Sequence, residues 1–137
     1  MSTDPTFQKQ GPLMNSNELA LFDLLTKAVG PEYLIMPQVH LEKLIDPIRW
    51  KGDKKYAVGH VSRWSVDFAL FDSKTWQPAL AIELNGDSHN NPDKIKRDDE
   101  VKHHLSEAGI PLLTFRNHKL PTSEELLGAI HAKLQIK

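Results

Sequence analysis

Apolar residues recur at helical spacing early in the chain and at strand spacing soon after it. The helical stripe consists of Leu21, Leu24, Leu25 and Ala28. It follows the polar residues 15–17, which can cap a helix, and it stops at Gly30. Residues 33–39 then predict a strand, and residues 41–45 predict a helical turn. Residues 46–63 are polar and predict a long loop, a kind of segment that is often functional in a compact domain.

The second half of the chain carries the clearer periodicity. Residues 64–71 and 79–85 alternate apolar and polar positions, and they predict the two strands of a hairpin. Helical patterns over residues 93–108 and 123–134 flank a further apolar strand at residues 111–115. The predicted order is helix, strand, strand, strand, helix, strand, helix. It belongs to the α/β class and predicts a mixed four-stranded sheet flanked by helices.

Length and composition limit the kind of protein. The 137 residues suit one domain, which we place at residues 15–137 behind a flexible tail of residues 1–14. The absence of cysteine removes disulfides, thiolate zinc sites and cysteine nucleophiles. The polar start lacks the apolar core of a signal peptide, and no apolar run approaches the roughly 20 residues of a membrane span. We therefore expect a cytoplasmic protein that does not enter the membrane.

Charge is balanced overall but locally concentrated. The chain has 17 basic and 18 acidic residues, so its net charge of −1 does not by itself indicate nucleic acid. One stretch, residues 49–63, is here called the basic loop, and the aromatic residues Trp50, Tyr56 and Trp64 are interleaved with it or follow it. Its basic side chains are Arg49, Lys51, Lys54, Lys55, His60 and Arg63. The loop fits contact with a nucleic-acid backbone, with simple solvation as the alternative.

Two acidic side chains share a face of the predicted hairpin. Because side chains alternate along a strand, Asp67 points away from the apolar face of the first strand. Glu83 and Asn85 point away from the apolar face of the second. When the two apolar faces coincide, the carboxylates and the amide meet on the other side, which also carries Ala69 and Ala81. An acid pair half-buried there needs a partner, and a hard divalent cation such as Mg²⁺ or Mn²⁺ is a natural one.

A wider set of motifs surrounds this pair. It comprises Val66-Asp67-Phe68, Ala81-Ile82-Glu83-Leu84-Asn85-Gly86, His89, Arg97-Asp98 and Ala108-Gly109-Ile110-Pro111-Leu112-Leu113. This pattern, within residues 17–117, resembles the PD-(D/E)XK, or restriction-endonuclease-like, nuclease superfamily. The likeness is nearest to small bacterial domains of unknown function in that superfamily and more distant to the very-short-patch-repair endonucleases. The resemblance implies a restriction-endonuclease-like core, in which a helix precedes a three-stranded meander, a second helix and a further strand.

The resemblance also implies roles for single residues. Asp67 and Glu83 match the two metal-binding acids of the motif. Glu18, on the first helix, matches the position where many members place an additional acid. Asn85 falls where the motif has lysine, so the sequence departs from the pattern at the position that would stabilise charge on the phosphate. Asparagine can position a water molecule there, but it supplies no charge.

Other residues are candidates for the missing cation and for the base. Arg97 and Lys102 border the buried stripe of the helix at residues 93–108, from which they can face the sheet. Arg97 is also a candidate nucleic-acid contact, together with the basic loop. His89, in the loop after the second hairpin strand, is a candidate base or phosphate contact. Ordinary structural roles are the alternatives: local ion pairs for Arg97 and a turn conformation for Asn85.

The implied function is hydrolysis of phosphodiester bonds in nucleic acid, with a Mg²⁺-dependent DNA endonuclease as the leading hypothesis. Cutting both strands of a duplex needs two sites, so we also consider a homodimer. Asn85 motivates an alternative, a catalytically inactive nuclease fold that binds nucleic acid or a protein partner. A small-ligand domain ranks last, because Gly86 is isolated and no phosphate-cradling glycine pattern is present. The sequence does not decide whether the substrate is DNA or RNA.

Overall fold

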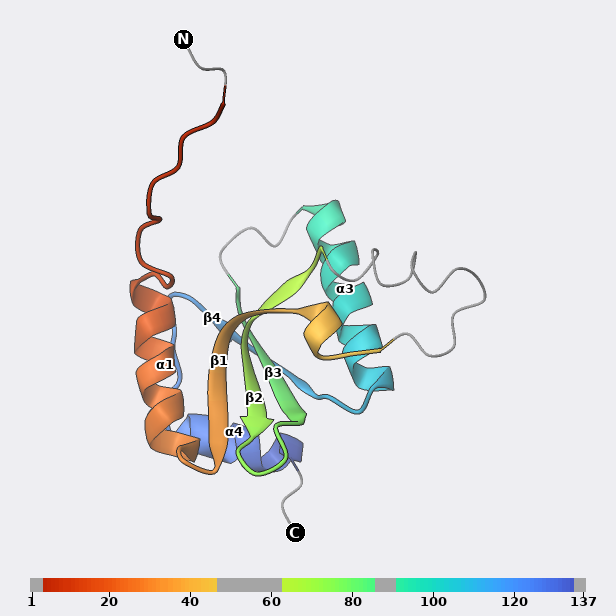
Figure 1. Ribbon diagram of the computed structural model, residues 1–137. Coiled ribbons are helices and arrows are strands. Elements are labelled where there is room, and N and C mark those ends of the chain that lie inside the picture. Colours follow the sequence, from red (N-terminus) through yellow and green to blue (C-terminus); the bar gives the residue numbers. More distant parts are fainter. Residues whose placement is uncertain (1–3, 47–62, 86–90, 135–137) are drawn as a thin grey trace.

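The computed structural model describes residues 4–46, 63–85 and 91–134 (Figure 1). Its helices and strands occur in the order that the sequence predicts. They are α1 (Ser16–Val29), β1 (Tyr33–His40), the short 3-10 helix η1 (Leu41–Lys43), β2 (Ser65–Asp72), β3 (Pro78–Asn85), α3 (Pro92–Glu107), β4 (Leu112–Arg116) and α4 (Ser123–Leu134). Among the predicted functional residues, His89 and all of the basic loop except Arg63 lie outside the described ranges.

The four strands form one mixed sheet in the order β1-β2-β3-β4. β1 pairs with β2, and β2 with β3, in antiparallel fashion, whereas β3 and β4 are parallel. A parallel pair needs a crossover connection, and α3 lies in the segment that supplies it. The predicted α/β class, with a mixed four-stranded sheet and flanking helices, is therefore confirmed.

Helices cover both faces of this sheet (Figure 1). α1 and α4 lie on one face over the larger core. That core consists of Leu21, Leu25, Val29, Phe68, Leu70, Leu80, Ile82, Leu113, Leu126 and Ile130. α3 lies on the other face, where its Val101 and Leu105 share a second core with Ala69 and Ala81 of the strands. Small side chains at these strand positions leave room for the helix, and the remaining positions on that face are available to polar groups.

The ladder between β1 and β2 is irregular at Gln38. The residues on either side of Gln38 pair with β2, but Gln38 itself does not, and it lies at the level of Asp67 with a positive φ of 52°. Such a φ is uncommon for a residue other than glycine. The Gln38 side chain donates a 2.8 Å hydrogen bond to Glu18 of α1. At this end of β2, Val66 joins the α3 core, although strict alternation places it with Phe68.

The helices are amphipathic, and each buries one stripe of side chains. α3 buries Val101 and Leu105, and α4 buries Leu126 and Ile130. Most of the remaining positions on these helices are exposed or half-buried. Within the described ranges, no helix is both long and apolar enough to cross a membrane.

Candidate active site

Asp67 of β2 and Glu83 of β3 lie on adjacent strands and on the face that α3 covers. The pairing of Phe68 with Ile82 sets the register that brings the two acids level with each other. Oδ2 of Asp67 accepts a 2.7 Å hydrogen bond from the backbone N–H of Leu84, which ties the side chain to the neighbouring strand. Both acids are half-buried. The strand phase predicted from the sequence therefore produces a pair of carboxylates at one place in the fold.

Burial and mutual repulsion oppose the ionisation of this pair. Burial raises the pKa of Glu83 to about 8, and the neighbouring charge of Asp67 acts in the same direction. Burial also raises the pKa of Asp67; the N–H of Leu84 opposes that rise, and the charge of Glu18 adds to it. Near neutral pH the site therefore holds a proton, or attracts a cation in its place.

The side of α3 that buries Val101 carries polar side chains nearer the start of the helix, and these lie close to the two acids. One and two turns before the buried Val101, the same side of the helix carries Lys94, Arg97 and Asp98. All three are half-buried, whereas their neighbours Asp93, Ile95, Lys96 and Asp99 are exposed. The charges of Arg97 and Lys94 act to lower the pKa of both strand carboxylates, and the charge of Asp98 acts to raise that of the β3 acid.

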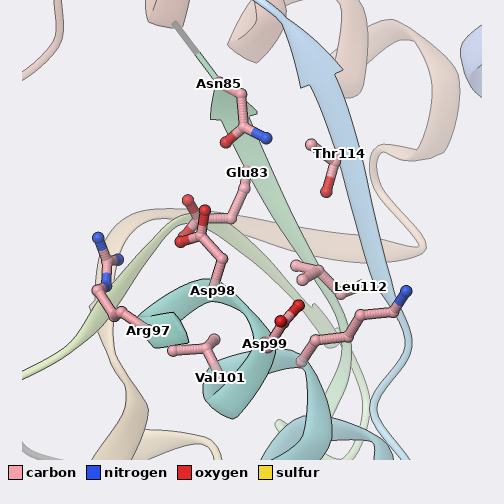
Figure 2. A pocket seen from close by; sticks show the side chains of 9 residues that line it. Glu83, Asn85, Arg97, Asp98, Asp99, Val101, Leu112 and Thr114 are labelled. Carbon is pink, nitrogen blue, oxygen red and sulfur yellow. The ribbon is translucent and has the colours of Figure 1, made fainter. Parts of the chain in front are cut away.

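A small cavity of about 100 Å³ lies between β3, β4 and α3 (Figure 2). Its polar lining consists of Glu83, Asn85, Arg97, Asp98, Asp99, Lys102 and Thr114, and its apolar residues are Val101 and Leu112. Figure 2 shows the carboxylates of Glu83 and Asp98 close together, with the Arg97 side chain rising from α3 beside them. The cavity thus joins acidic, cationic and neutral polar groups.

Several of the predicted site residues meet at this cavity. Asn85, Arg97 and Lys102 line it together with Glu83, and Asp67 lies on the next strand. Asn85 follows Glu83 by two residues on the same face of β3, as strand alternation predicts. The catalytic and nucleic-acid-binding roles that the sequence suggests for these residues remain predictions.

Glu18 has a structural role in the described fold. It forms a capping box with Asn15 at the start of α1, and its Oε1 accepts a 2.8 Å hydrogen bond from the Asn15 N–H. Its Oε2 accepts the hydrogen bond from Gln38. The Glu18 charge reaches Asp67 and raises its pKa, yet both carboxylate oxygens already have donors. A metal-binding role for Glu18 would have to replace or share these bonds, and it remains a prediction.

Arg63 is the described member of the basic loop. Its guanidinium carbon lies 5.1 Å from the centre of the Trp64 ring. Trp64 in turn stacks on His104 of α3, with 6.4 Å between ring centres and 22° between planes. Arg63 is exposed beside this stack. The other predicted backbone contacts lie outside the described residues: Arg49, Lys51, Lys54 and Lys55.

The structure adds residues to the site that were not predicted from the sequence, among them Lys94 and Thr114. Lys94 precedes Arg97 by three residues on the same helical stripe, so the periodicity of α3 contained a signal for it. Thr114 lines the cavity because β4 pairs it with Glu83 in parallel register. That register depends on how the crossover packs, so no local pattern in the sequence could have indicated Thr114.

The oxygen ligands at this site are few. Among the residues that the structure describes, no group of three or more His, Cys, Asp or Glu side chains is spaced to hold a metal ion. The site offers two strand carboxylates, and the adjoining cavity adds the carboxylates of Asp98 and Asp99, an amide and a hydroxyl. Mg²⁺ is commonly bound through only one or two carboxylates, with water and substrate phosphate as its other ligands. The arrangement therefore suits a hydrated ion better than a closed cage of protein ligands.

Fold and site together define an α/β domain in which a mixed four-stranded sheet carries a carboxylate pair beside a cavity lined by both acidic and basic side chains. The chain belongs to the family described as "Protein of unknown function (DUF2726)", whose sequence profile matches residues 9–134. No curated protein and no solved structure gave a significant match. The family description names no activity, so function has to be argued from the site.

Proposed function

We propose that this domain is a metal-dependent nuclease of the PD-(D/E)XK type that hydrolyses phosphodiester bonds, with DNA as its substrate. The observation that carries the proposal is the half-buried pair of Asp67 and Glu83, with Arg97 and Lys102 at the adjoining cavity. The element order from α1 to β4 supports it, because a helix, a three-stranded meander, a helix and a strand are the parts that such a core requires.

The residues present fit a bound divalent ion. The raised pKa values of Asp67 and Glu83 indicate two acids that repel each other in a partly buried place, which a cation relieves. These two residues would hold Mg²⁺ or Mn²⁺, which when bound lowers the pKa of a water ligand and offsets charge on the phosphate. The N–H of Leu84 keeps the Asp67 carboxylate oriented for this role.

The chain's own side chains supply the remaining chemistry. Hydrolysis joins a water oxygen to phosphorus and breaks one P–O ester bond, which leaves a phosphate monoester and a hydroxyl group. The attacking water must lose a proton, and we assign its acceptance to His89 or to a second water hydrogen-bonded to Asn85. Lys102 and Arg97 place positive charge at the cavity, where negative charge develops on the phosphate. Arg63 and the basic loop are assigned to the nucleic-acid backbone.

Asn85 supports a second candidate function. At Asn85 the site has a neutral amide on β3 in place of a cation. Such a site suits a catalytically inactive nuclease fold that binds nucleic acid or a protein partner. This candidate predicts nucleic-acid binding without cleavage under every metal condition.

A cleavage assay separates the two candidates. The full chain is incubated with plasmid DNA, single-stranded DNA and RNA in Mg²⁺, in Mn²⁺ and in EDTA, beside the Asp67→Ala/Glu83→Ala variant. The nuclease proposal expects metal-dependent nicking or degradation that the double variant lacks, and the preferred substrate identifies DNA or RNA. Folded wild-type protein that cleaves none of these substrates, or a double variant that cleaves equally well, would contradict it.

A further inference from the structure

Arg97 carries a buried polar atom that lacks a hydrogen-bond partner. It is half-buried, and its Nε atom is fully covered without a hydrogen-bond partner. Nearly all buried donors in native proteins are hydrogen-bonded, because leaving one unsatisfied is costly. Within the described residues no ion pair holds the guanidinium, although the cavity also carries the carboxylates of Glu83, Asp98 and Asp99. Because the covered Nε is closed to outside groups, a ligand at the cavity can be reached only by the remaining, accessible part of the guanidinium.

The position of Arg97 suits an anion that sits in front of the strand acids. Its charge acts on both Asp67 and Glu83, so it lies near both of them without bonding to either. In Figure 2 its side chain rises from α3 at the side of the Glu83 and Asp98 carboxylates. A guanidinium is planar, always charged, and presents its donors in a fork that matches two oxygens of a phosphate.

The strands supply no positive charge at this point. Asn85 occupies the position on β3 next to Glu83 on the same face, and its amide is neutral. Lys102 lines the cavity but is exposed, where an ammonium group stays hydrated and its interactions are weak. Arg97 is thus the cationic side chain of the cavity that is partly desolvated.

We propose that Arg97 is the phosphate-binding residue of this domain, donating hydrogen bonds from its two guanidinium amino groups to non-bridging oxygens of a phosphodiester at the cavity. The inference deepens the proposed function and rests on it. It assigns to α3 the positive charge that Asn85 cannot provide. The competing role for Arg97 is a counter-ion that only stabilises the acid pair. Removal of a phosphate contact lowers the affinity for nucleic acid. Removal of a counter-ion instead changes the pKa values of the two acids and their affinity for a metal ion.

Binding of a labelled oligothymidylate tests the assignment directly. Fluorescence anisotropy is measured with the full chain in Ca²⁺, an ion that also takes oxygen ligands, and in EDTA, over a series of salt concentrations. The variants are Arg97→Gln, Arg97→Lys and, as a matched control, Lys96→Gln. Lys96 is exposed on the same helix, and its substitution removes the same charge outside the cavity.

The phosphate-binding role predicts a clear order of affinities. Arg97→Gln should bind roughly tenfold or more weakly than wild type, as loss of a charged hydrogen bond implies. The salt dependence of its logarithmic affinity should fall by about 0.7, the value of one phosphate contact on a single strand. Arg97→Lys should lie between wild type and Arg97→Gln, because it keeps the charge but loses the fork. Affinity of Arg97→Gln equal to that of Lys96→Gln would overturn the assignment.

Titration calorimetry with Mn²⁺ separates failure of the inference from failure of the proposed function. Mn²⁺ affinity of Arg97→Gln close to that of wild type supports a phosphate contact, whereas a change of roughly tenfold or more in either direction assigns Arg97 to the acid pair and overturns the inference. A wild type that neither binds Mn²⁺ nor cleaves would refute the nuclease, and the oligonucleotide comparison would still decide the role of Arg97. Thermal melts monitor folding, and Arg97→Lys carries the test if Arg97→Gln does not fold.

Discussion

Glu83 is the residue whose protonation the fold changes most among the described residues with a resolved shift. The fold raises the pKa of Glu83 from its ordinary value of 4.5 to about 8. Between pH 4.5 and 8, Glu83 is therefore protonated in the folded state and ionised in the unfolded state. The contribution of Glu83 to stability should therefore be fully present below pH 4.5, be lost as pH rises through the window from 4.5 to 8, and stay constant above it. The raised pKa of Asp67 contributes in the same direction.

The variant Glu83→Gln should remove most of this pH dependence. We expect it to be more stable than wild type at pH 8 to 9, by on the order of a few kcal/mol at most, because a neutral amide needs no proton there. Urea unfolding in EDTA at several pH values between 5 and 9 measures the difference. Parallel stability curves for the two proteins would show that Glu83 titrates normally in the folded state.

The predictability of the site differs among its residues for physical reasons. Asp67, Glu83 and Asn85 could be placed on one face from strand alternation alone, because the side-chain period of a strand is fixed. The buried Nε of Arg97 could not be predicted. It depends on how closely the helix approaches the sheet, and therefore on the small side chains beneath it, which no local pattern specifies.

At the scale of the elements, α1 is tied to the sheet through Glu18. The capping box satisfies the free N–H groups at the helix start, and the Gln38 hydrogen bond joins that start to β1. The sequence predicted the helix and its polar cap from residues 15–17. It did not indicate the bond to Gln38, because that contact requires the positive φ of Gln38 and the packing of α1 beside β1.

Substitution of Glu18 distinguishes a helix cap from a metal ligand. We expect Glu18→Ala to lower the free energy of unfolding by about 1 kcal/mol, the usual cost of a lost cap. Mn²⁺ affinity should change little, since both Glu18 oxygens already accept hydrogen bonds within the protein. Urea unfolding and calorimetry measure the two quantities. A loss of Mn²⁺ binding comparable to that of Asp67→Ala would instead identify Glu18 as a ligand.

The helices and strands themselves were predictable almost throughout. The hairpin of β2 and β3, the crossover α3 and the closing α4 all follow from periodicity and turn residues, and their bounds differ from the predicted ones by at most one residue. Side-chain alternation fails at Val66, which joins the α3 core next to the irregular Gln38. The irregularity lies at Gln38 of β1, which is distant in sequence from Val66. The sequence around Val66 therefore does not indicate which core Val66 joins.

At the scale of the whole molecule, balanced charge means that nucleic-acid binding would depend on local clusters. The basic loop is the strongest such cluster in the sequence. We expect Lys54→Gln/Lys55→Gln to weaken binding of single-stranded DNA and to lower its salt dependence by about 1.4, the value of two phosphate contacts. The control Lys27→Gln/Lys133→Gln removes two exposed charges from α1 and α4, on the opposite side of the sheet from α3. Equal effects of the two double variants would exclude a specific role for the loop.

Binding of a divalent ion by Asp67 and Glu83 together is tested most directly by Mn²⁺ calorimetry of the full chain. The matched variants are Asp67→Asn and Asp72→Asn, which make the same change at the site and at the far end of β2. Titrations at pH 7 in two buffers of different ionisation enthalpy also count the protons released.

Wild type and Asp72→Asn should bind Mn²⁺ with release of about one proton, because Glu83 is mostly protonated at that pH and must ionise to become a ligand. Asp67→Asn should lose the binding, and Glu83→Gln should release no proton if it binds at all. Absence of Mn²⁺ binding in the wild type, or binding by Asp67→Asn equal to that of Asp72→Asn, would contradict the two-carboxylate metal site and the nuclease function built on it.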